Sequence, residues 1–131
     1  MSDETISDDM MTIDEMQEIL DGLAEELPPI FYEELNGGIL LLPEAHRSQY
    51  AQADDLWTLG EYRYSHTMGR YIVIFYGSFM KLFGHYDRER MIKELRKTLR
   101  HEFRHHMESL AGEDGLEKED AAFIAKYLGG F

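Results

Sequence analysis

Two histidines separated by one helical turn are the residues of this sequence with the clearest chemistry. They are His101 and His105, and Glu102 directly follows the first of them. Residues four apart lie about 6 Å from each other on one helix face, so both imidazoles can reach a single cation. Glu102 is turned by about 100° around the helix, which keeps it beside a water on that cation rather than among its ligands. The pattern His-Glu-x-x-His therefore predicts a zinc ion, with Glu102 as the general base.

The helix that carries this pattern is expected to turn the histidines away from its apolar side. At about 100° per residue, His101 and His105 fall roughly 180–220° from Ile92. The apolar stripe comprises Ile92, Leu95, Leu99, Phe103 and Leu110. The alternative is a pair of ordinary surface histidines, because a short motif can arise by chance in a chain with 6 histidines. The helical context favours the metal site.

A catalytic zinc site needs a third protein ligand and one open position. Glu108 shares the face of His101 but lies about 10 Å further along the helix axis. We therefore expect Glu108 to orient one histidine rather than to touch the ion. Glu117, in the segment that follows the end of the helix, is the first choice for the third ligand. Asp120 and Asp114 are the alternatives.

The other histidines are expected to serve the core or the solvent. His106 falls near the apolar side of the helix, which predicts a buried, hydrogen-bonded ring rather than a ligand. His46, His66 and His85 lie in predicted loops, where they are solvated or contact a substrate.

The elements that would position these residues are helices at both ends and strands between them. Thr12 and Glu15 form a capping-box pattern, so a helix is predicted from there to the prolines at 28–29, followed by a short helix over 30–35. A long helix is predicted from Asp87 to Gly112, and a last one over 116–128.

Three strands are predicted in the middle of the chain, at 39–42, 56–64 and 70–76, with a polar loop over 43–55. The strand at 70–76 is rich in β-branched and aromatic residues, which is typical of a core strand. At a sheet edge beside the metal it could instead pair with an extended peptide.

Length and composition indicate one domain, residues 13–131, after a flexible acidic tail over 1–12. The net charge of −13 disfavours nucleic acid and anionic membranes as partners. The chain has no cysteine, which leaves histidine and carboxylates as the strong metal ligands. An acidic start without an apolar run favours the cytoplasm.

Several segments resemble the minimal zincin-like metallopeptidase family of small bacterial proteins. They are 38–42, 59–62, 70–77 and His101-Glu102-Phe103-Arg104-His105-His106, of which the doubled histidine is the most specific. The resemblance implies an α+β, zincin-like fold, with a small mixed sheet of about three strands packed on a long active-site helix. It also implies zinc held by His101 and His105, Glu102 as the base, and a peptide or protein substrate.

The sequence departs from this family at the end of its motif. Shorter members resemble HExxHHxGxxD, whereas Glu108 and Ala111 stand at the glycine and aspartate positions here. The departure implies that the third ligand is displaced or missing. A zinc-dependent peptidase is the leading hypothesis. The alternatives are a non-catalytic, metal-stabilised binding or regulatory module, and an acidic interaction protein without metal.

Overall fold

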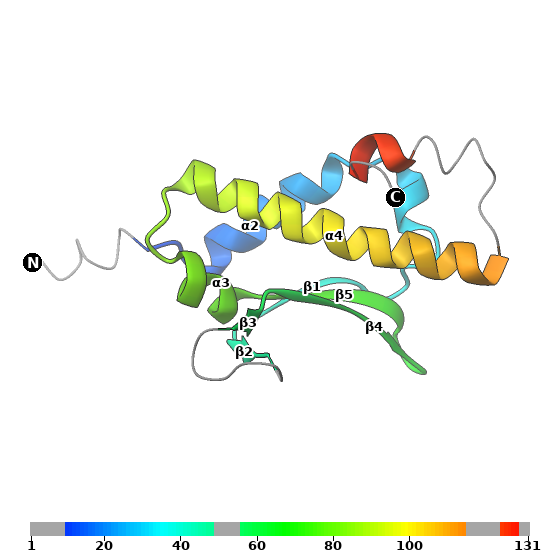
Figure 1. The fold of residues 1–131 in the computed structure, drawn as a ribbon, viewed down its shortest axis with the longest axis horizontal. Coiled ribbons are helices and arrows are strands. Elements are labelled where there is room, and N and C mark those ends of the chain that lie inside the picture. The colour runs from blue at the N-terminus through cyan, green and yellow to red at the C-terminus, as the bar shows by residue number, and fades with distance from the viewer. Residues whose placement is uncertain (1–9, 49–55, 115–123, 129–131) are drawn as a thin grey trace, which may run out of the picture.

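A computed structural model describes residues 10–48, 56–114 and 124–128 as a mixed sheet with helices on one face (Figure 1). The elements, in chain order, are α2 (Ile13–Glu25), η1 (Pro29–Tyr32), β1 (Gly38–Leu42), β2 (His46–Arg47), β3 (Trp57–Thr58), β4 (Gly60–Ser65), β5 (Gly69–Phe75), α3 (Tyr76–Phe83) and α4 (Arg88–Asp114). Residues 124–128 are also helical. The α+β class predicted from the sequence is confirmed. Within the described part, no helix is both long and apolar enough to cross a bilayer.

The main sheet has the strand order β1-β5-β4, so β5 lies in the middle and β4 at one edge. β1 runs parallel to β5, with Ile39 opposite Ile72, and β4 runs antiparallel to β5, with Tyr62 opposite Ile72. Residues 72–75 of β5 are fully buried, as expected of a central strand. The prediction of a core strand is confirmed over residues 70–75, and the edge beside α4 belongs to β4 instead.

The long helix α4 begins where the sequence predicted, because the Asp87 carboxylate accepts a hydrogen bond from the Arg90 backbone N–H at 2.8 Å. The predicted end at Gly112 is wrong, since α4 continues to Asp114. One glycine within a helix costs about 1 kcal/mol relative to alanine, which the neighbouring turns can offset. Gly112 is exposed, and a Cβ there would meet nothing within 4 Å.

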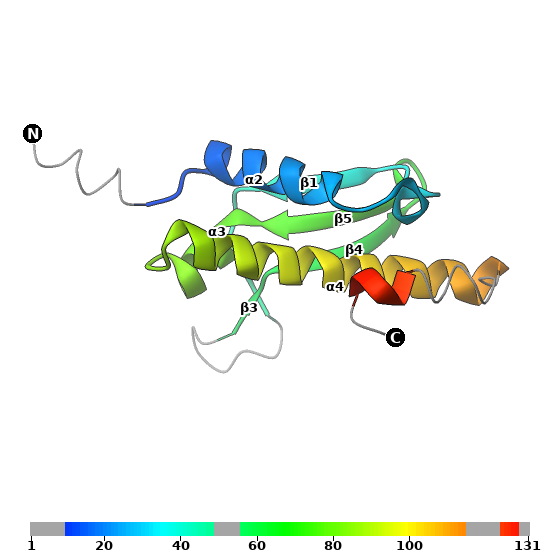
Figure 2. The ribbon, with the colours of Figure 1, turned by 90° about the horizontal axis from the view of Figure 1, so that it is seen from above.

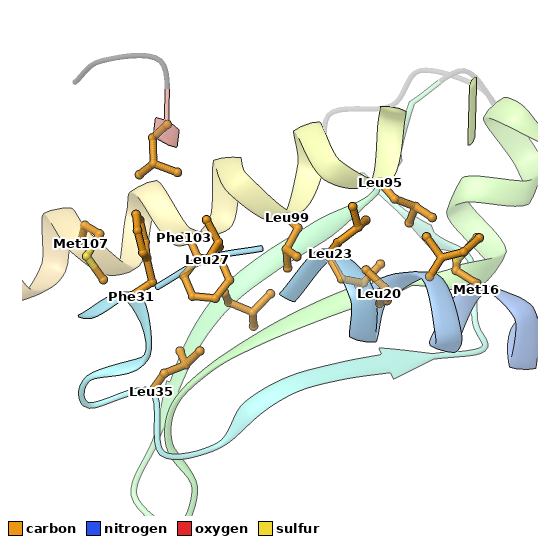
Figure 3. Packing of buried hydrophobic residues seen from close by; sticks show 14 of the residues in the cluster. Met16, Leu20, Leu23, Leu27, Phe31, Leu35, Leu95, Leu99, Phe103 and Met107 are labelled. Carbon is orange, nitrogen blue, oxygen red and sulfur yellow. The ribbon is translucent and has the colours of Figure 1, made fainter. Parts of the chain in front are cut away.

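Helix α2 packs beside α4 over the sheet, as Figure 2 shows from above. Its predicted capping box is present, with the Thr12 hydroxyl accepting from the Glu15 N–H and the Glu15 carboxylate accepting from the Thr12 N–H. Figure 3 shows the core between the two helices, where buried side chains form a row from Met16 and Leu95 at one end to Phe31, Phe103 and Met107 at the other. The rings of Phe31 and Phe103 pack edge to face, with centroids 6.0 Å apart.

The middle of the chain contains more elements than the sequence predicted. Tyr76, assigned to a strand, instead begins α3, because the apolar run passes from β5 directly into a helix. The strand predicted over 56–64 divides into β3 and β4, and β2 lies within the predicted loop and pairs with β3. The short helix predicted over 30–35 is a single 3₁₀ turn, η1. The N-terminal tail up to residue 9 and most of the predicted last helix lie outside the described residues.

Candidate metal centre and cleft

The two motif histidines converge on the exposed side of α4, as predicted. Both side chains are exposed, and their Nε2 atoms lie 3.1 Å apart. Two nitrogens bound at about 2.05 Å to a tetrahedral zinc would lie about 3.3 Å apart, so the pair has nearly the spacing of two ligands of one ion. Without metal, the same contact is a hydrogen bond in which one ring donates to the other. The donor atoms therefore fit a zinc ion.

Glu108 lies where it can orient one of these rings. Its Oε1 atom is 3.5 Å from Nδ1 of His105, while Nε2 of the same ring faces His101. A proton on Nδ1 of His105 would leave Nε2 with a lone pair, which is the form that binds a cation. Burial lowers the pKa of His101, and the positive charges near it on His105 and Arg104 lower it further.

Glu102 directly follows His101 on α4. Unlike the two histidines it is buried, with 5% of its surface exposed. Burial raises the pKa of Glu102 to about 7, and the negative charge of Glu61 adds to the rise. A carboxyl group with a pKa near neutrality can both accept and return a proton. The predicted base is thus placed in an environment that suits proton transfer.

A cleft of about 660 Å³ lies between α4 and the edge strand β4. Its lining combines Glu61 and Tyr62 from β4 with His101, Glu102, His105 and Glu108 from α4. A second hollow of about 320 Å³ adjoins it, and the two share Gly60, His101 and Glu102. The candidate metal ligands and base therefore stand where the two hollows meet.

Gly60 allows β4 to approach α4 closely at this point. A Cβ on Gly60 would lie 3.1 Å from Cδ1 of Ile74 and 3.2 Å from Cγ2 of Thr98, tighter than ordinary van der Waals contact. The absence of a side chain thus keeps the strand against the helix beside Glu102.

The backbone of β4 points away from β5 at alternate residues along this cleft. The Phe75 N–H donates to the Leu59 carbonyl at 3.0 Å, so hydrogen bonds to β5 fall on the odd-numbered residues of β4. The backbone groups of Gly60, Tyr62 and Tyr64 consequently point away from β5. No other strand pairs with this edge in the part of the chain that the structure describes.

His106 is a structural residue, as predicted. Its ring is fully buried, and Nε2 donates to the Glu33 carbonyl at 2.7 Å while Nδ1 accepts from the Tyr62 hydroxyl at 2.8 Å. Burial lowers the pKa of His106, which agrees with a neutral ring bonded at both nitrogens. His106 therefore links α4, β4 and the turn after η1, next to the pair of exposed histidines.

The third ligand is not identified among the described residues, where no group of three metal-capable side chains occurs. The first choice, Glu117, and its alternative Asp120 lie outside the described residues. Asp114 ends α4, and its side chain is likewise outside the description.

Sequence reasoning missed the wall of the cleft opposite α4. Gly60, Glu61 and Trp57 line it, and their only signal was a loosely alternating segment with a glycine within it. His46 belongs to this side as well, since it lies in β2 with Nε2 3.8 Å from the Glu61 carboxylate. The position of His66 in a loop is confirmed, because it lies in the turn between β4 and β5.

Comparison with known proteins gives a relative among the solved structures. No family model matches the chain, and no curated protein matches it. A solved structure, described as a conserved hypothetical protein from Thermo thermophilus, is 35% identical and superposes with a TM-score of 0.66. The match covers 79% of this chain and 100% of that protein. The chain belongs to the same family as this protein. The description of the relative assigns no activity, so function must be argued from the site.

Proposed function

We propose that this protein is a zinc-dependent metallopeptidase with a zincin-like active site. His101 and His105 would hold the ion, and Glu102 would act as the general base. The observation that carries the proposal is the convergence of two Nε2 atoms, 3.1 Å apart, beside a buried carboxyl group in a cleft. Glutamate is almost never buried unless it is paired, so a buried Glu102 beside two converging histidines favours a functional role.

Each residue of the site has a separate task in peptide hydrolysis. A bound zinc ion supplies Lewis-acid polarisation and lowers the pKa of water. Glu102 accepts a proton from the attacking water as the water oxygen bonds to the peptide carbonyl carbon. Glu102 then gives that proton to the amide nitrogen as the carbon–nitrogen bond breaks, which releases a carboxylic acid and an amine.

The edge strand supplies a means to hold the substrate. An extended peptide can pair with the outward backbone groups at the start of β4, where Gly60 lies beside His101 and Glu102. Such pairing recognises the peptide backbone rather than one side chain. The proposed substrate is therefore an extended peptide or an unfolded segment of a protein.

The ligand set needs one more donor, and we propose Glu117 for it, with Asp120 as the alternative. Glu108 acts through His105, whose Nδ1 atom it faces. Because Glu108 stands where related motifs have glycine, its carboxylate is a feature of this chain rather than a requirement of the motif.

Zinc content and cleavage of a diverse peptide library test the proposal. We expect about one zinc per chain and cleavage that is reduced at least ~10²-fold in Glu102→Gln, since general-base catalysis contributes roughly 10²–10⁴-fold. Glu18→Gln is the matched control, because Glu18 is exposed on α2, away from the cleft. Equal cleavage by wild type and Glu102→Gln would refute the catalytic role.

A second candidate function is a metal-stabilised binding module without turnover. It is favoured by the donor set of two histidines, which has no third member among residues 10–48, 56–114 and 124–128. Chelation should then lower the melting temperature by several degrees while no peptide is cleaved. A zinc-loaded protein that cleaves peptides would decide for the peptidase.

A further inference from the structure

The hollow beside the candidate metal ligands has a chemistry of its own. It has a volume of about 320 Å³ and is lined by Trp57, Leu59, Gly60, Lys97, Thr98, His101 and Glu102; we call it the Trp57 pocket. We propose that the Trp57 pocket binds a carboxylate carried on a short apolar stem. The inference rests on the proposed function only in assigning that carboxylate to a substrate.

The wall of the Trp57 pocket is apolar, and strand pairing holds its backbone. Trp57 lies in β3, and Leu59 precedes β4, where its carbonyl is fixed by the hydrogen bond from Phe75. Both side chains are half-buried, so each keeps an exposed surface toward the pocket. Gly60 and His101 line the pocket between this wall and the motif. A stem of a few methylene groups can therefore be covered on its way into the pocket.

The mouth of the pocket carries positive charge. Lys97 lies one helical turn before His101 on α4, and its side chain is 75% exposed. Its ion pair with Glu94, at 3.5 Å, joins residues one turn apart on the helix surface, and such pairs contribute little. A second ammonium group, on Lys81 of α3, lies 5.5 Å from the centre of the Trp57 ring. A carboxylate entering the pocket would thus meet Lys97, and Lys81 adds positive charge near the Trp57 ring.

Negative charge is concentrated at the other end of the cleft. Glu61 and Glu108 line the 660 Å³ hollow and not the Trp57 pocket. Glu102 borders both hollows, but it is buried between them rather than at the lysine end. Between these two hollows, the one that carries a lysine is the Trp57 pocket, so a substrate carboxylate is favoured there rather than beside Glu61 and Glu108.

The acidic balance of the whole chain is compatible with this local preference. Exposed charges further away than about 8 Å are largely screened at physiological ionic strength. A net charge of −13 therefore disfavours a polyanion, whereas a single carboxylate responds to the two nearby lysines. The expected ligand is a peptide with one acidic group next to the bond that is cleaved.

Trp57 is the only tryptophan in the chain, so its fluorescence reports directly on the pocket. The full-length protein would be titrated with N-acetylglutamate α-amide and with N-acetylglutamine α-amide, which differ only in the side-chain carboxylate. A second pair, N-acetylalanine and its amide, presents a chain-terminal carboxylate instead. We expect carboxylate binding at least about 10-fold tighter than binding of the matched amide, as for charge-assisted hydrogen bonds.

The Lys97→Met variant should abolish the preference while keeping most of the aliphatic stem. Lys93→Met is the control, because it removes the same charge from the same helix. Lys93 is exposed and does not line the pocket. A response to the glutamate probe or to N-acetylalanine supports the site and identifies the source of the carboxylate. Equal binding of carboxylates and amides, or an unchanged preference in Lys97→Met, would overturn the proposal.

The titration requires no turnover, which separates the two proposals. Selective carboxylate binding without peptide cleavage would keep the pocket and reject the peptidase. Peptide cleavage that is equal for the carboxylate and amide forms of both the side chain and the chain terminus, and unchanged by Lys97→Met, would keep the peptidase and reject the pocket.

Discussion

The two faces of α4 show how one helix can carry both the core and a candidate reactive site. His105 and His106 are neighbours in the chain, yet the first is exposed and faces another histidine, whereas the second is fully buried. A rotation of about 100° between successive residues accounts for the difference. The buried face is specified by close packing, and the cleft face by the arrangement of polar atoms. Changes on the two faces should therefore have different consequences.

The largest effect on stability is expected from the buried face. Phe103→Ala removes a fully buried ring that packs against Phe31 and Tyr32, and such losses cost about 3–5 kcal/mol. His105→Ala, on the cleft face, should change the metal-free protein by less than about 1 kcal/mol. Urea unfolding of both variants without metal measures the contrast. Similar losses of unfolding free energy in Phe103→Ala and His105→Ala would show that the two faces of α4 do not differ in their contribution to stability.

Metal should act on the cleft face alone. Zinc at about 100 times its dissociation constant should stabilise the wild-type protein by about 2.7 kcal/mol. His101→Ala and His105→Ala should each remove most of this gain, because each removes one of two converging donors. Thermal unfolding with and without zinc provides the measurement, and Lys93→Met provides the control. Retention of the full gain in both alanine variants would place the ion elsewhere.

His106 tests the boundary between the two faces. His106→Phe leaves the Tyr62 hydroxyl and the Glu33 carbonyl without their buried partner, at a cost of about 1–3 kcal/mol. Tyr62→Phe removes the other half of one bond. The double variant should lose less stability than the sum of the single variants, by about 0.5–2 kcal/mol. Additive losses would mean that this hydrogen bond contributes nothing.

The sequence predicted the buried face of α4 well, because the periodic apolar residues report helical phase directly. The outward position of His101 and His105 followed from the same phase, as did the buried state of His106. The cleft wall from β3 and β4 could not be predicted, since it depends on strand order and on which strand lies at the edge. The segment 70–76 was identified as a strand, but its place in the middle of the sheet is set by long-range pairing with β1 and β4.

Local signals also misplaced two boundaries. Gly112 was taken as the end of α4, although an exposed glycine is tolerated where the surrounding turns are stable. Gly77 was taken as the end of a strand, although it lies in α3, where a Cβ would come within 2.5 Å of the Ala45 nitrogen. The requirement at Gly77 is close backbone contact, which no local pattern reveals.

Two glycines should respond in opposite directions to the same substitution. Gly60→Ala places a methyl group 3.1–3.2 Å from Ile74 and Thr98, so β4 must move from α4, at a cost of about 1 kcal/mol and with reduced peptide cleavage. Gly112→Ala meets open space within a helix and should stabilise by up to about 1 kcal/mol. Melting temperatures of the two variants test both signs. A stabilising Gly60→Ala would show that β4 is not held tightly at the cleft.

The smallest effect is expected at the rim of α4, where Glu26 joins the end of α2 to the long helix. The Glu26 carboxylate accepts hydrogen bonds from Arg96 at 2.8 and 3.0 Å and from Arg100 at 2.9 Å. The bond from Arg96 is the main cause of the lowered pKa of Glu26. Because these groups are partly exposed, Glu26→Gln should cost only about 0.2–1 kcal/mol at neutral pH.

The pH dependence of this pair follows from the direction of the shift. A carboxyl group whose pKa is lower in the folded than in the unfolded protein stabilises the fold above the unfolded value, and that contribution is lost as the pH falls through the folded value. The difference in unfolding free energy between wild type and Glu26→Gln should therefore be constant near neutrality and disappear in acid. Glu18→Gln is the matched control, because it removes a carboxylate from an exposed position on the same helix. A difference that persists in acid would mean that Glu26 acts by packing rather than by charge, and that the rim resembles the buried face.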